Sequence, residues 1–164
     1  MRKLLLLLFL LPLFATAQEK QLLKLLNDEL QKQSKFQFKS PAFSDDTIKI
    51  IQSFTLSDDK VLSLKIRQHQ PHLDGYIDWL QEVPLKKILT IDKDMNVIFR
   101  ANGDDVRSTV TRFTKGEEPK TFVENTNLFF LYFFTPNNNE ALGKKIRQAF
   151  HAAGYPIEVE FWAD

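Results

Sequence analysis

The sequence predicts an α+β domain with a mainly antiparallel sheet of about six to seven strands, an N-terminal amphipathic helix and a C-terminal amphipathic helix. Three observations support this class. Leucines recur at helical spacing near the N-terminus, apolar and polar residues alternate in several short segments separated by turn residues, and a second helical pattern precedes the last strand. The chain length of 164 residues suits one domain.

Residues 1–17 have the layout of a secretory signal peptide. Met1-Arg2-Lys3 is basic, residues 4–14 are apolar, and Ala15-Thr16-Ala17 offers small residues to a signal peptidase. The apolar run is shorter than the roughly 20 residues that span a bilayer. We therefore expect cleavage after Ala17, a single α+β domain over 18–164, no later transmembrane segment, and a secreted or periplasmic location. An uncleaved anchor and a buried helix are the alternatives.

Residues 19–33 are predicted to form the first helix, because Leu22, Leu23, Leu26 and Leu30 form one apolar stripe. Residues 34–46 have a mixed pattern that suits a short edge strand followed by a loop. Residues 48–67 alternate on both sides of the turn at 57–60, which predicts an antiparallel hairpin.

Residues 72–82 suit either a short helix or a strand, and the pattern does not decide between them. A second hairpin is predicted over 85–101, with Leu89 and Ile91 leading into the turn at 92–96 and Val97 and Phe99 leading out. Val106 to Phe113 reads as a further strand, residues 116–119 as a turn, and residues 120–134 as one or two strands.

The last helix should begin at an Asn137 cap and end at Gly154, where a left-handed C-cap residue is expected before Pro156. Residues 157–162 then alternate as a terminal strand. That alternation predicts a buried Phe161 and an exposed Glu160.

Composition excludes several classes of protein. The nearly balanced charge argues against a nucleic-acid binder, and the absence of Cys excludes disulfides, thiolate metal sites and a Cys nucleophile. No glycine-rich phosphate loop and no G-x-S-x-G nucleophile turn is present.

Two polar clusters resemble metal sites only in part. His69, His72 and Asp74 could supply a ligand set, but Pro71 separates the two histidines and no further ligand has a known position. Asp92, Asp94 and Asn96 match the start of a calcium loop, which then lacks its glycine and its bidentate glutamate. Loop and turn residues explain both patterns, so no metal and no cofactor is expected.

The sequence is rich in phenylalanine, and residues 128–134 are apolar at every position. A strand with two apolar faces must be covered on both sides. The two helices could cover both faces, or one face could bind a ligand, a partner or a second subunit. In the second case the face would consist of Phe129, Phe130, Tyr132, Phe133 and Phe134.

These observations favour a non-catalytic binding or interaction module of the cell envelope that contacts a protein partner. The alternative is a carrier that holds an apolar small molecule on the Phe-rich face. An envelope hydrolase using His69, His72 and nearby carboxylates is a third hypothesis. An enclosed apolar pocket would favour the carrier, and an exposed aromatic patch would favour the interaction module.

Overall fold

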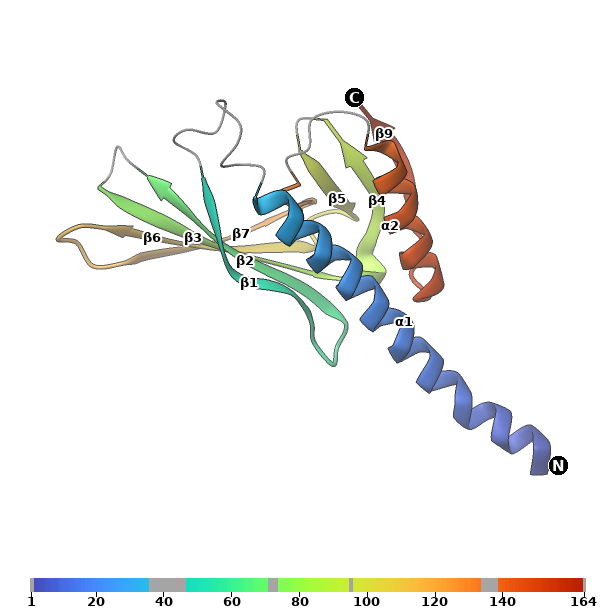
Figure 1. Ribbon diagram of the computed structural model, residues 1–164. Coiled ribbons are helices and arrows are strands. Elements are labelled where there is room, and N and C mark those ends of the chain that lie inside the picture. Colours follow the sequence, from blue (N-terminus) through green and yellow to red (C-terminus); the bar gives the residue numbers. More distant parts are fainter. Residues whose placement is uncertain (1, 36–46, 71–73, 95, 134–138, 164) are drawn as a thin grey trace.

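The computed structural model describes residues 2–35, 47–70, 74–94, 96–133 and 139–163. These residues form two helices, nine strands and one short 3₁₀ helix, η4 (Leu85–Lys87). The predicted α+β class and the antiparallel majority are confirmed, and the strands divide into two sheets (Figure 1).

The first sheet has five antiparallel strands in the order β1-β2-β3-β6-β7. Their bounds are Ile48–Leu56, Val61–Gln70, Gly75–Pro84, Val106–Thr114 and Lys120–Thr126. The pairing of β3 with both β2 and β6 shows that the ambiguous segment 72–82 contributes a strand over its described residues. In Figure 1 the hairpin of β6 and β7 extends away from the helices.

The second sheet has four strands in the order β8-β5-β4-β9. Their bounds are Leu128–Phe130, Val97–Ala101, Ile88–Lys93 and Glu158–Trp162. Pairing is antiparallel except between β4 and β9, which run parallel. That parallel pair needs a crossover connection, and the chain between the two strands includes the helix α2 (Glu140–Ala152).

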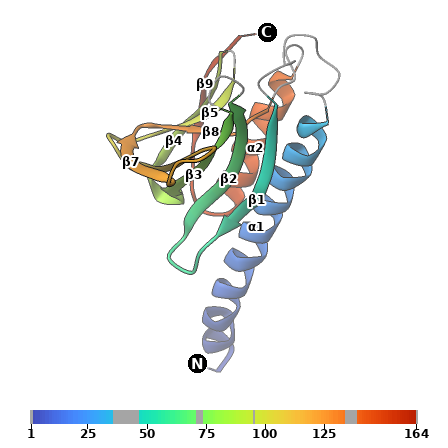
Figure 2. The ribbon, with the colours of Figure 1, turned by 90° about the vertical axis from the view of Figure 1, so that its left-hand side faces the viewer.

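The core lies where one face of the first sheet meets the second sheet and the two helices. Leu22, Leu26 and Leu30 of α1 (Arg2–Ser34) are fully buried, as the predicted leucine stripe requires. They belong to one hydrophobic cluster with Leu62 and Leu64 of β2. Figure 2 shows α1 running alongside β1, the outer strand of the first sheet.

Helix α1 is continuous through the predicted signal segment and the predicted helix 19–33, and its first half extends beyond the sheets (Figures 1 and 2). Glu19 of α1 is buried against the rest of the domain. Its carboxylate accepts hydrogen bonds from Lys60 Nζ at 2.6 Å and from the Tyr155 hydroxyl at 2.9 Å. These bonds fix the helix to the β1–β2 turn and to the chain that follows α2.

Helix α2 ends as predicted and begins later than predicted. Gly154 has a φ of 87°, and the amide of Tyr155 donates to the Phe150 carbonyl, which closes the helix with a left-handed cap. At the other end Asn139 is the N-cap residue and makes no side-chain cap bond. Asn137, the predicted cap, lies outside the described residues.

Irregular register decides which strand residues are buried. Leu89 is exposed beside a bulge between β4 and β5, and its neighbours Ile88 and Ile91 are buried. The predicted burial of Phe161 is wrong. Phe161 is 56% exposed, because a register shift in the β4–β9 pairing lies next to it. Trp162 packs inward in its place, and its Nε1 donates to Asn139 Oδ1 at 2.9 Å.

Candidate functional site

The first sheet carries a groove on the same face that forms the core. Directly opposed residues of antiparallel strands project from one face, so Ile66, Trp79, Val110 and Phe122 form a row across β2, β3, β6 and β7. Ile66 is in the core and Phe122 is exposed. The face of the first sheet is therefore buried at β2 and exposed to solvent at β7.

This groove, which we term the inter-sheet groove, has a volume of about 450 Å³. Trp79, Leu128, Phe130 and Tyr132 supply its apolar surface. The polar lining includes Gln68, Gln81, Asn96, Ser108, Glu124 and Thr126. The volume lies in the range of small-molecule sites, and the combination of apolar walls with a few polar groups is typical of them.

Gln81 joins the two sheets within the groove. Its side-chain amide donates to the Phe130 carbonyl at 3.2 Å, and its oxygen accepts from the Phe130 amide at 2.9 Å. Gln81 is buried, so these bonds satisfy a polar group that would otherwise destabilise the core face. They also hold β8 against β3 and fix the position of the Phe130 ring.

Trp79 lines the groove and carries a hydrogen-bond donor without a partner in the described residues. Its Nε1 atom is buried and has no acceptor in the described structure. A buried donor without a partner costs about 1–3 kcal/mol, and native structures rarely leave one without a ligand or water. The indole therefore favours a ligand that brings a hydrogen-bond acceptor.

Tyr132 closes one wall of the groove from an unusual backbone conformation. Its φ is 57°, a left-handed value that is rare for a bulky residue and often marks a functional or constrained position. Burial raises the pKa of its phenol well above the usual value. The centroid of the ring lies 6.4 Å from that of the Phe130 ring.

The aromatic segment divides between core and groove. Phe129 and Phe133 are fully buried, and both rings lie near Phe54, with centroids 6.3 and 6.4 Å away. Phe130 and Tyr132 line the groove instead. Phe134 lies outside the described residues. The predicted open face therefore loses Phe129 and Phe133 to the core, and of its described residues it keeps Phe130 and Tyr132.

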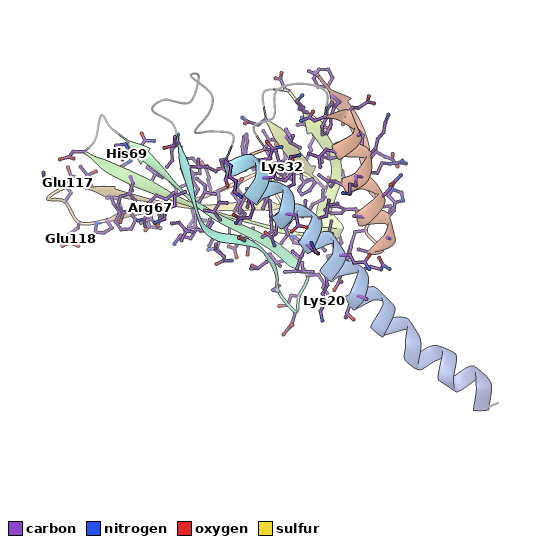
Figure 3. All side chains as sticks on the ribbon, in the orientation of Figure 1. Lys20, Lys32, Arg67, His69, Glu117 and Glu118 are labelled. Carbon is purple, nitrogen blue, oxygen red and sulfur yellow. The ribbon has the colours of Figure 1, made fainter. Side chains whose placement is uncertain are left out.

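Two of the three predicted metal residues, His69 and Asp74, lie in the described part of the chain. His69 is exposed on β2 (Figure 3), and Asp74 is exposed and pairs with Lys115 at 3.3 Å. His72 lies outside the described residues. No group of three or more His, Cys, Asp or Glu side chains in the described ranges has the proximity to hold a metal ion.

The calcium-like residues occupy a hairpin turn. Asp92 is a buried strand residue whose Oδ2 accepts from Arg100 Nε at 3.0 Å. Asp94 is exposed, and Asn96 lines the inter-sheet groove. The three side chains therefore lie in three different environments.

The opposite face of the first sheet carries a charged and aromatic cluster. Arg67 donates from Nε and Nη2 to the two Asp78 oxygens at 2.6 and 3.0 Å. Its guanidinium also lies 3.7 Å from the centroid of the Tyr76 ring, which stacks on Phe113. The Arg67 hydrogen bonds hold the pKa of Asp78 below its usual value. Because its charges are already paired, this cluster fits a structural role.

A larger hollow of about 630 Å³ lies between the end of α1 and β1. Ser34, Thr47 and His69 are among its lining residues. Ser34 and Thr47 stand close to residues 36–46, which lie outside the described part of the chain. We therefore place the candidate site in the inter-sheet groove.

No family model, curated protein or solved structure matches this chain. Among the described helices, none has the length and apolar character needed to cross a membrane. The functional proposal therefore rests on the groove and on the sequence.

Proposed function

We propose that this protein is an exported, non-catalytic binding domain whose inter-sheet groove holds an apolar or aromatic small molecule with a hydrogen-bond acceptor. The observation that carries the proposal is the shared apolar surface of Trp79, Leu128, Phe130 and Tyr132, together with a Trp79 Nε1 donor that is buried and unpaired in the described residues. The ligand would lie against these side chains and accept from the indole.

The lining chemistry supports binding over catalysis. Among the described residues that line the groove, Glu124 is the one acidic side chain, and none is histidine, lysine or arginine. General acid–base catalysis needs titratable groups placed around the reacting atoms. Amide, hydroxyl and aromatic side chains instead provide shape and hydrogen bonding.

The expected location follows from residues 1–17. A cleaved signal peptide would deliver the domain to the cell envelope or outside the cell. Envelope proteins that carry apolar molecules must shield them from water, and a groove of this size covers a molecule of drug-like dimensions.

Fluorescence of 1-anilinonaphthalene-8-sulfonate tests the proposal, because this probe is aromatic and its sulfonate is an acceptor. Phe130→Ala should weaken probe binding about tenfold or more by removing a wall. Trp79→Phe removes the donor and keeps most of the apolar area, so it should weaken binding about two- to twelvefold.

Leu89→Ala is the matched control, because it removes an exposed apolar side chain outside the groove. It should leave probe binding unchanged. Thermal melts of all variants separate loss of binding from loss of folding. If the parent protein binds no probe, or if Phe130→Ala binds it as tightly as the parent, the groove is not the site.

A further inference from the structure

Strand β7 presents an open edge to solvent. Within the described residues it pairs with β6 alone and ends the order of the first sheet. Phe122 and Val123 lie in the middle of the strand on opposite faces, and each is 54% exposed. An accessible edge with large apolar side chains is a template for pairing with another strand.

The sequence of β7 is complementary to itself. If two copies pair in antiparallel fashion with Phe122 opposite Phe122, Lys120 of each copy faces Glu124 of the other. Thr121 then faces Val123. We infer that two copies of this chain associate through β7 and join their five-stranded sheets into one.

The side chains of β7 suit this symmetric pairing. Lys120, Phe122 and Glu124 alternate along the strand and project from one face, so both ion pairs would flank the central phenylalanines. Lys120 already pairs with Glu117 at 2.8 Å, but both side chains are more than half exposed. Such a pair contributes little, and Lys120 can exchange it at small cost.

The pairing also gives the exposed Phe122 a cover. Phe122 ends the row that includes Trp79 and Val110, and a two-fold axis between the two paired β7 strands, perpendicular to the sheet, would continue this row into the second copy. A self-complementary patch of this kind is what a two-fold dimer requires. The charge pattern thus favours a second copy as the partner, because β7 would not need to be complementary to itself in order to pair with an unrelated strand.

The dimer should be concentration-dependent. An edge of seven residues buries less than the roughly 800 Å² per partner of a standard interface. We therefore expect exchange between monomer and dimer at micromolar concentrations. This inference does not depend on ligand binding in the inter-sheet groove.

Sedimentation velocity from about 1 μM to about 500 μM tests the inference with two charge variants. Glu124→Lys places lysine opposite lysine, and Lys120→Glu places glutamate opposite glutamate. Each variant alone should dimerise at least about tenfold more weakly than the parent. Mixed together they should form a heterodimer, because each restores the opposite charge that the other lacks.

Glu118→Lys is the control, since it makes the same charge change in the turn outside β7. It should dimerise as the parent does. Circular dichroism melts verify that each variant is folded, and the mixing step reports association even if one variant is less stable. A parent that stays monomeric up to about 500 μM, unaffected dimerisation in both single variants, or variants that do not combine would overturn the inference.

Discussion

Replacing Asp78 by Asn should destabilise the fold through the Arg67–Asp78 pair. The Asp78 side chain is only 6% exposed, and it accepts two hydrogen bonds from Arg67 and approaches Lys65 Nζ at 3.5 Å. Asparagine is nearly isosteric, but it removes the charge and turns an NH₂ group toward the donors. The substitution therefore tests the ion pair without opening a cavity.

The magnitude follows from the burial of the two partners. Removing one partner of a fully buried pair costs about 3–5 kcal/mol, and a hydrogen bond to a charged group contributes about 1.5–3 kcal/mol. The Arg67 side chain is 33% exposed, so water can solvate part of the guanidinium that the substitution leaves behind. We expect a loss of about 2–3 kcal/mol in the free energy of unfolding at pH 7.

Urea unfolding at several pH values measures this loss. The folded-state pKa of Asp78 is depressed, so its stabilisation is present above the unfolded value of about 3.9 and is lost as the pH falls through the folded value. The difference between parent and Asp78→Asn should be constant from about pH 5 to 8 and should narrow in acid.

Asp28→Asn is the matched control, because Asp28 forms an exposed pair with Lys24 on the surface of α1. It should change stability by about 0.5 kcal/mol or less. An Asp78→Asn variant as stable as this control would contradict the reasoning. So would a difference that widens as the pH falls, because it would require a raised pKa of Asp78 in the folded state.

Three further outcomes are expected. Trp162→Ala should lower the free energy of unfolding in urea by about 3 kcal/mol or more, because the indole packs against the core and is hydrogen bonded. Phe161→Ala should lower it by less than about 1 kcal/mol, because Phe161 is exposed. Equal losses in the two variants would contradict the observed register. Burial and a neighbouring carboxylate raise the pKa of Tyr155, so its stabilisation should be lost as the pH rises above about 10, and Tyr155→Phe should reduce that alkaline loss in pH-dependent melts. Mass spectrometry of the protein from its native host should find Gln18 as the first residue, and a soluble product that retains Met1 would refute the predicted cleavage.

Periodicity in the sequence predicted most of the fold. The leucine stripe of α1, the hairpins around residues 57–60 and 92–96, and the Gly154 cap of α2 all depend on local spacing and on turn chemistry. Each signal lies within one or two elements of the chain. The predictions from these signals agree with the structure because the neighbouring elements bury the same faces that are apolar in the sequence.

The sequence pattern did not predict the strand register or the division of the strands into two sheets. A slip of one residue exchanges the two faces of a strand, and the irregularities beside Leu89 and Phe161 have no signature in the alternation itself. The sequence favours Phe161 as the buried residue, but the β4–β9 pairing selects Trp162. Only the three-dimensional partner strand decides which of the two adjacent aromatic residues is buried.

The sequence predicted part of the candidate site. Residues 128–134 stood out as apolar on both faces, and Phe130 and Tyr132 do line the groove. Trp79 and Gln81 were missed because they lie in the segment that fitted either helix or strand. Gln81 carried the stronger signal, since a glutamine on the apolar side of a strand needs a buried partner, here Phe130, 49 residues later in the sequence.

The groove and the free edge lie on one face of the first sheet, which the second sheet covers only in part. Strands β2 and β3 have ten residues each, whereas β8 and β5 have three and five. At about 3.3 Å per residue, the first sheet extends well beyond the second, which covers only part of its apolar face. The uncovered part starts at Trp79 and continues to Phe122 on β7. A domain of this design keeps an apolar surface that folding alone does not bury, and a groove ligand and a second copy would cover neighbouring stretches of it that meet at Glu124.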